Sequence, residues 1–151
     1  MTEQPPVRVG EVFDLGAAVV DRDSMVAFAA LYDPQPFHLD EEAARASVFG
    51  TLVASGLQTL AIMQGLAVRS GLLVRLGAEA GLGTDETRLL NPVRPGDDLR
   101  VTAEVLGVTP SRHREGQGIG RCLFTATNQH GKTVARYEGR MLVRLDRWAA
   151  G

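Results

Sequence analysis

Two side chains that can move protons, Asp33 and His38, stand five positions apart in a segment that also contains two prolines. A histidine ring titrates at about pH 6.5, and an aspartate stays ionised at neutral pH. A carboxylate and an imidazole held in one pocket can therefore take a proton from water and give it back. The segment predicts general acid–base chemistry.

This spacing brings the two side chains together only if the loop turns back. Residues five positions apart in an extended chain lie about 16 to 18 Å from each other. The prolines disfavour helix at the residue before each and predict a rigid, extended-to-turn loop. In the alternative interpretation, Asp33 caps a helix or a turn and His38 bonds to loop carbonyls. Asp40 is expected to cap a short helix over residues 40–45.

A second feature is the sequence Ala54-Ser55-Gly56, which stands where a long apolar segment begins. A glycine at the start of a helix lets a ligand approach the main chain, and the helix dipole there favours oxygen that carries negative charge. The N–H of Gly56 is therefore a candidate to polarise a thioester carbonyl. A simpler interpretation, compatible with the first, is that Ser55 caps the helix and Gly56 relieves crowding.

The elements that must position these residues follow from the hydrophobic periodicity. Helices are expected over residues 25–31, 40–45 and 55–76. Strands are expected over residues 12–20, 99–105, 122–127 and 135–145, with turns at 95–97 and 128–131 and an exposed loop at 112–118. The helix over 55–76 is apolar on most sides, so protein must wrap it. The sequence predicts an α+β fold in which a curved antiparallel sheet surrounds one central helix.

Composition limits the class of protein. The chain has 151 residues, 44% of them hydrophobic, and is expected to form a single domain over 1–151 with a flexible lead over 1–8. Its 16 basic and 18 acidic residues give a net charge of -2 without a basic stripe, which argues against nucleic-acid or membrane partners. Gln64 and Arg69 interrupt the apolar helix too early for a bilayer span.

The single cysteine, Cys122, cannot form an internal disulfide and lies in an alternating strand pattern. A small buried thiol in a reducing compartment fits this pattern, so a cytoplasmic location is expected. The alternative, a nucleophilic thiol, lacks a His or Asp motif beside it in the sequence.

Other chemistries find little support. The three histidines have no spacing typical of metal ligands, so no metal site is expected. The sequence also lacks a GxGxxG fingerprint, a P-loop and a GxSxG elbow, so dinucleotide, nucleotide and serine-hydrolase sites are not expected.

Three separated motifs carry a family resemblance. They are Tyr32–Asp40, Phe49-Gly50 with Ala54-Ser55-Gly56, and the sequence Asn-Pro-Val-Arg-Pro-Gly-Asp over Asn91–Asp97. In kind and order they resemble the MaoC-like dehydratase family, which includes the (R)-specific enoyl-CoA hydratases. The resemblance extends over nearly the whole chain.

The resemblance implies a hotdog fold, usually paired into a dimer with an acyl-CoA tunnel near the subunit interface. It also implies site roles. Asp33 would activate water for attack on C3 of a trans-2-enoyl thioester, and His38 would orient that water and relay the proton to C2. The N–H of Gly56 would stabilise the enolate-like oxygen.

The chain departs from the family pattern at two positions. Many hydratases of the family carry Ala-His-Gly where this chain has Ala54-Ser55-Gly56, and Asn-Pro where it has Gln35-Pro36, so Ser55 and Gln35 are the residues that differ. These two residues and Phe37 are expected to border the reacting end of the substrate. Gln64 is the candidate for a polar residue that supports the acid in some members.

The function that follows is reversible hydration of trans-2-enoyl-CoA, or dehydration of 3-hydroxyacyl-CoA, without a cofactor. CoA is favoured over an acyl carrier protein as the carrier, and a homodimer or dimer of dimers is expected. Two alternatives stay open: a hotdog acyl-CoA thioesterase, and a non-catalytic subunit that binds acyl thioesters.

Overall fold

The structure of the chain, a computed structural model, describes residues 4–150. One antiparallel sheet has the strand order β1-β3-β4-β5-β2. The strands are β1 (Val12–Val19), β2 (Ala78–Leu89), β3 (Asp98–Pro110), β4 (Gln117–Thr127) and β5 (Thr133–Arg144). The helices are α1 (Arg22–Tyr32), α2 (Pro36–Leu39), α3 (Glu41–Arg45), α4 (Gly56–Arg69), α5 (Leu72–Arg75) and the 3₁₀ turn η1 (Leu145–Arg147).

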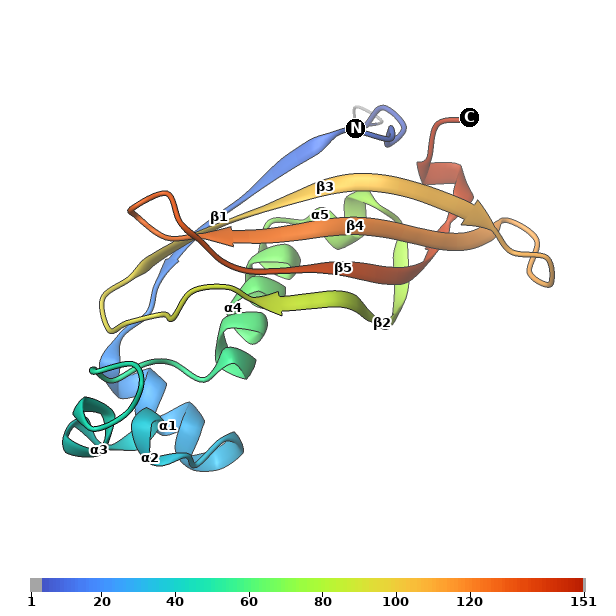
Figure 1. Cartoon of the computed structure of the whole chain (residues 1–151). Coiled ribbons are helices and arrows are strands. Elements are labelled where there is room, and N and C mark those ends of the chain that lie inside the picture. Colours follow the sequence, from blue (N-terminus) through green and yellow to red (C-terminus); the bar gives the residue numbers. More distant parts are fainter. Residues whose placement is uncertain (1–3, 151) are drawn as a thin grey trace.

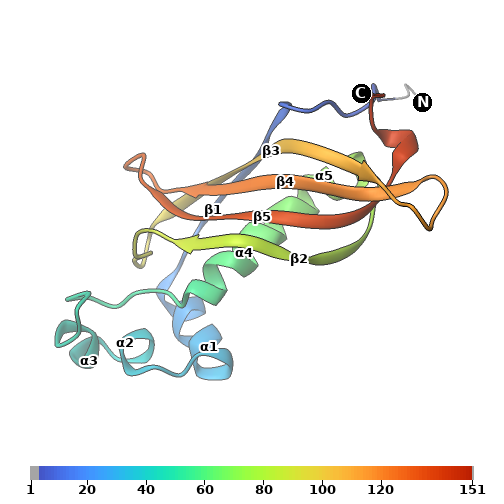
Figure 2. The same cartoon turned by 45° about the vertical axis from the view of Figure 1, so that its right-hand side comes forward.

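The sheet arches over α4, and the expected α+β arrangement is confirmed (Figure 1). Helices α1, α2 and α3 gather beyond the N-terminal end of α4, whereas the first and last described residues lie at the opposite end of the sheet (Figure 2). The strands and turns expected from alternation are present, and the side chains of β4 alternate strictly between buried and half-buried. This arrangement directs the start of α4 toward the segment that holds Asp33 and His38.

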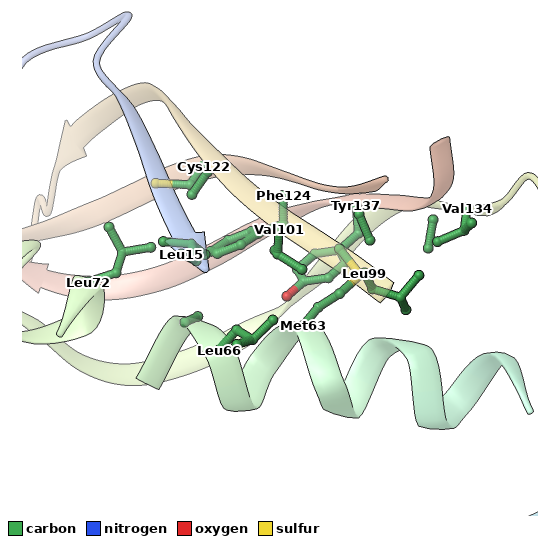
Figure 3. Packing of buried hydrophobic residues seen from close by; sticks show 14 of the residues in the cluster. Leu15, Met63, Leu66, Leu72, Leu99, Val101, Cys122, Phe124, Val134 and Tyr137 are labelled. Atoms are coloured by element: carbon green, nitrogen blue, oxygen red, sulfur yellow. The ribbon is translucent and has the colours of Figure 1, made fainter. Parts of the chain in front are cut away.

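The core fixes how α4 is rotated against the sheet. Met63 and Leu66 on α4 point toward Leu99, Phe124 and Tyr137 on the strands (Figure 3). All five side chains are buried. Burying one large apolar side chain contributes about 1.5 to 3 kcal/mol, so this packing holds the helix in one orientation. The position of the first turn of α4 follows from it.

The helix expected over 55–76 is two helices. Helix α4 ends at Arg69, and the four-residue helix α5 follows after Gly71, which adopts a left-handed conformation with φ of 80°. The hydroxyl of Ser70 bonds to the carbonyl of Ala67 at 2.9 Å and helps to end the first helix. Apolar periodicity continues through this break, so it did not mark the boundary. No helix within residues 4–150 has the length and apolar character needed to cross a membrane.

Strand β2 has no counterpart among the expected elements. It lies at the edge of the sheet and pairs only with β5, with three shifts of register along its length. Most of its residues are exposed. Alternation of buried and exposed side chains is the signal of a half-buried strand, and an irregular exposed edge lacks it.

Two terminal or loop expectations need correction. The loop expected over 33–40 contains a helical turn, α2, because Pro36 at its first position has a φ suited to helix and loses no hydrogen bond there. Of the lead expected over 1–8, residues 1–3 lie outside the described part. Val7 is not free: it is 1% exposed, and its backbone bonds to Arg147 and Ala149.

The exposed loop expected over 112–118 is shorter. Strand β3 ends at Pro110 and β4 begins at Gln117, so the connection is residues 111–116. Gly118 is buried in β4, and a β-carbon built on it would lie 2.7 Å from the carbonyl oxygen of Thr109. Glycine in this position is a packing requirement of the strand pair.

We predict opposite effects from alanine at two glycines near the helix break. Gly71→Ala should lower the free energy of unfolding by about 1 to 2 kcal/mol, because a β-carbon disfavours the left-handed conformation. Gly65→Ala is the matched control within α4, where only the flexible end of Arg69 lies near the new methyl group. It should be neutral or stabilise by up to about 1 kcal/mol. Denaturant titration of both variants measures the difference, and equal effects would contradict the helix break.

Candidate active site

The carboxylate of Asp33 lies where α1 ends. Asp33 is the C-cap residue, and its N–H donates to the carbonyl of Ala29 at 2.9 Å. Its side chain reaches the head of α4, where the hydroxyl of Ser55 donates to Oδ2 at 2.7 Å. The side-chain amide of Gln35 donates to Oδ1 at 2.8 Å. Both oxygens are therefore held in a fixed direction.

His38 is buried beside this carboxylate, with 5% of its surface exposed. Its Nδ1 lies 2.7 Å from the carbonyl oxygen of Val53, and its Nε2 lies 3.3 Å from Oδ2 of Asp33. A carbonyl oxygen can only accept, so the proton is assigned to Nδ1. In the neutral ring this leaves the lone pair of Nε2 facing the carboxylate, where it can accept and release a proton.

The proline segment thus turns back, as the acid–base interpretation requires. The alternative is also partly correct, because Asp33 occupies a cap position and His38 satisfies the Val53 carbonyl. Asp40 does what was expected of it: it caps α3 and accepts from the N–H of Ala43 at 2.8 Å. The structure therefore assigns Asp40 to the helix and joins Asp33 with His38.

The surroundings of Asp33 stabilise its ionised form. The hydrogen bond from Ser55, then the one from Gln35, hold the pKa of Asp33 below its ordinary value against the opposing effect of burial, and His38 adds to them when its ring is protonated. At neutral pH this carboxyl group is ionised and can accept a proton.

Asp33 and His38 both line a cavity of about 420 Å³, within the range of small-ligand sites. They are its only titratable lining residues among the described part of the chain. Much of the remaining wall is apolar and includes Phe37, Val93 and Leu90. Phe37 lies against Phe49, with ring centroids 5.3 Å apart. The cavity suits a ligand with an apolar portion that meets one acid–base pair.

Gly56 also lines this cavity, at the first position of α4. None of the hydrogen bonds found within residues 4–150 uses its N–H. A β-carbon built on Gly56 would come within 2.2 Å of Leu89 Cδ1, so a side chain there would require Leu89 to move. The glycine leaves a free main-chain donor beside the acid–base pair, at the positive end of the helix dipole.

Two residues expected at the site lie elsewhere or act differently. Ser55 is fully buried behind Asp33 and does not line the cavity; it holds the carboxylate and caps α4 through the N–H of Leu57. Gln64 lines a second cavity, of about 410 Å³, beside Tyr137 and Arg140. It lies eight residues along α4 from Gly56, about 12 Å by helix geometry, and forms no hydrogen bond with Asp33. Support for the acid comes from Ser55 and Gln35 instead.

Three contributors to the site were not anticipated. The carbonyl of Val53 anchors His38, but a main-chain group leaves no mark in residue type. Leu89 lines the cavity from the end of β2, the strand that the sequence did not reveal. Thr59 lines the cavity one turn into α4, within the segment that the periodicity predicts as an apolar helix. The spacing of Gly56 and Thr59 on one helical face would have been the available signal.

The remaining candidate chemistries are not favoured by the geometry. Within residues 4–150, no cluster of three or more His, Cys, Asp or Glu side chains is arranged to hold a metal ion. Cys122 is buried, and burial raises the pKa of its thiol to about 12. It therefore stays protonated and lacks nucleophilic character.

Comparisons with known proteins agree with this arrangement. The MaoC like domain matches residues 5–139. The crystal structure of a MaoC-like dehydratase from Rhodospirillum rubrum has a TM-score of 0.86 and 44% identity, and the match covers 95% of this chain and 96% of that one. Uncharacterized protein YdeM of Bacillus subtilis is 36% identical over 139 residues, 92% of this chain and 95% of its own.

A third relative has a stated reaction. The 3-hydroxyacyl-thioester dehydratase Z of Mycobacterium tuberculosis is 33% identical over 76 residues, which is 50% of each chain. The family match extends over most of the chain, and the fold agrees with that of the Rhodospirillum rubrum protein. The chain therefore belongs to the MaoC-like dehydratase family and has its hotdog fold.

Proposed function

We propose that the protein catalyses the reversible hydration of trans-2-enoyl-CoA and the reverse dehydration of 3-hydroxyacyl-CoA. The observation that carries the proposal is the 3.3 Å approach of His38 Nε2 to Asp33 Oδ2 at the wall of an apolar cavity. Membership of the dehydratase family and the reaction named for the Mycobacterium tuberculosis relative support it.

In the proposed hydration, a water molecule binds to Asp33 and His38 together. The water oxygen attacks C3 of the enoyl thioester while the pair takes one of its protons. Electrons of the C2–C3 double bond move toward the carbonyl oxygen, and the pair then returns the proton to C2. The other water proton stays on the new hydroxyl group, so the enzyme ends unchanged. Dehydration follows the same steps in reverse.

The negative charge that develops on the thioester oxygen needs a donor. The free N–H of Gly56 would supply one, and the dipole of α4 would add to it. Gln35 and Phe37, which line the cavity, would border the reacting end of the acyl group. The apolar wall would accept the acyl chain, and the CoA moiety would remain outside.

We also propose that the protein works as a homodimer, or a dimer of dimers. Strand β2 leaves one edge without a partner among residues 4–150. The outer face of the neighbouring helix α4 exposes Leu57 and Val68 by 55% and 54%. An unpaired edge beside an apolar stripe suits pairing with a second copy. Because Leu89 on β2 lines the cavity, such a partner would lie close to the site.

The first prediction from the proposed function concerns the acid–base pair. Asp33→Asn and His38→Ala should remain folded and lower the hydration rate of crotonyl-CoA or a longer enoyl-CoA by about 10² to 10⁴-fold, because each removes a positioned proton-transfer group. The matched control is His113→Ala, an exposed histidine in the loop over 111–116, which should leave the rate unchanged. Full activity in either site variant would rule out the proposed mechanism.

The same assay separates the alternatives. Free thiol is measured alongside hydration, because a thioesterase releases CoA thiol and a hydratase does not. Thiol release without hydration would favour the thioesterase. Tight binding of acyl-CoA without turnover of enoyl or hydroxyacyl substrates would favour a non-catalytic binding subunit.

The second prediction concerns pH. The base must be ionised, so activity is lost as the pH falls through the pKa of Asp33. Ser55→Ala removes the largest cause that lowers this pKa, so the acidic limb of the kcat/KM profile should move to higher pH. Gln35→Ala should move it in the same direction by less.

The effect of Ser55→Ala on the pH dependence of kcat/KM must be separated from its effect on folding, because Ser55 also caps α4. Loss of the cap should lower the free energy of unfolding by about 1 kcal/mol, and a fall in Tm measures this loss independently. Circular dichroism at each pH shows which part of the profile reports folded enzyme. Acidic limbs that coincide in both variants and the wild type would refute the role given to these hydrogen bonds.

The third prediction concerns assembly. Replacing both Leu57 and Val68 with lysine would put like charges against each other across the proposed interface, which costs several kcal/mol. Light scattering should then show a monomer where the wild type is a dimer. The control replaces Val12 and Val19 with lysine on β1, at the other edge of the sheet, where exposure is similar. A monomeric wild type, or dissociation by the control alone, would contradict the proposed face.

A further inference from the structure

We propose that Asp97 is a positioning residue for His38, acting through two peptide groups joined in one hydrogen-bonded chain. The inference rests on the proposed function, because it treats His38 as the proton-transfer group. Asp97 lies in the turn before β3 and is not among the residues that line the cavity. Each link of the chain is a hydrogen bond of the structure.

The first link starts at the histidine. His38 Nδ1 lies 2.7 Å from the carbonyl oxygen of Val53. That carbonyl belongs to the peptide group whose N–H is that of Ala54. The Ala54 N–H donates to the carbonyl oxygen of Val93 at 2.8 Å. One peptide group is thus held at both ends, by the imidazole on its oxygen and by Val93 on its nitrogen.

The second link repeats the arrangement. The Val93 carbonyl belongs to the peptide group whose N–H is that of Arg94. The Arg94 N–H donates to Oδ2 of Asp97 at 2.9 Å. All three donors point the same way, from His38 toward Asp97. The series of hydrogen bonds therefore ends on a carboxylate. Its negative charge lies at the positive end of the aligned peptide dipoles and interacts favourably with them.

The carboxylate of Asp97 is itself well fixed. It is 7% exposed, and its Oδ1 accepts from the side-chain amide of Gln129 at 2.8 Å. Gln129 lies in the turn between β4 and β5 and also accepts from the N–H of Asp98 at 3.1 Å. A buried carboxylate that accepts a hydrogen bond on each oxygen is not free to rotate into solvent. It therefore holds the last acceptor of the hydrogen-bonded series in a fixed position against the sheet.

Aligned hydrogen bonds polarise one another, and a charged acceptor at the end strengthens the whole series. A stronger acceptor at the Val53 oxygen binds the Nδ1 proton more firmly and makes Nε2 the nitrogen that exchanges protons. Outer partners of this kind commonly orient a reacting histidine. Here the partner acts through two peptide groups instead of touching the ring.

The test is Asp97→Asn in the whole chain of 151 residues. Asparagine keeps the shape and an acceptor for Arg94 but removes the charge. We expect kcat for enoyl-CoA hydration to fall by about tenfold with KM changed less than twofold, because only the histidine is affected. The nuclear magnetic resonance signal of the His38 Nδ1 proton should shift at the same time. This signal is independent of turnover, so it tests the chain even if the proposed reaction proves wrong.

The matched control is Asp98→Asn. Asp98 is the exposed neighbour and carries the same charge, but its side chain takes no part in the chain of bonds. It should change neither kcat nor the His38 signal. Equal effects of the two substitutions would show a general effect of net charge and overturn the proposal. So would a folded Asp97→Asn variant with an unchanged His38 signal, whatever its activity.

A measurement on the wild type keeps the proposal testable if Asp97→Asn does not fold. Nitrogen chemical shifts distinguish which ring nitrogen of His38 carries the proton in the neutral form. A proton on Nδ1 that exchanges slowly with solvent supports the chain. A proton on Nε2 would overturn it, because the first link would have no donor.

Discussion

The hydrogen bond between His38 Nδ1 and the Val53 carbonyl is the constraint on which the site depends. Helix α2 is a single turn and cannot hold its shape alone, so the ring stays in place only while the segment before α4 lies against it. That segment is held in turn by main-chain bonds from Val53 to Phe37 and from Ala54 to Val93. Three parts of the chain, distant in sequence, therefore set the direction of one imidazole.

Ser55 connects this constraint to the core. Its hydroxyl donates to Asp33 and accepts from the N–H of Leu57, so the carboxylate is tied to the first turn of α4. The packing of Met63 against the sheet fixes how that helix is rotated. The carboxylate, the free N–H of Gly56 and the imidazole thus share one rigid frame. Preorganised donors of this kind stabilise developing charge without first having to move.

Sequence reasoning reached the parts of this frame that residue type reveals. Alternation exposed the half-buried strands, and the spacing of Asp33 and His38 indicated the acid–base pair. It missed β2 because an irregular, exposed edge has no alternation, and it extended α4 through Gly71 because apolar periodicity does not register a change of backbone conformation. It placed Gln64 near the acid by analogy. It missed the Val53 carbonyl, because main-chain groups are the same in every residue.

The choice of neutral donors to Asp33 has a chemical consequence. Many hydratases that the chain resembles have a histidine where it has Ser55. A hydroxyl and an amide orient a carboxylate but carry no charge, and charge-assisted hydrogen bonds are roughly twice as strong as neutral ones. A cationic donor would lower the pKa of Asp33 further and weaken it as a base. Ser55 and Gln35 fix the direction of both oxygens with a smaller loss of basicity.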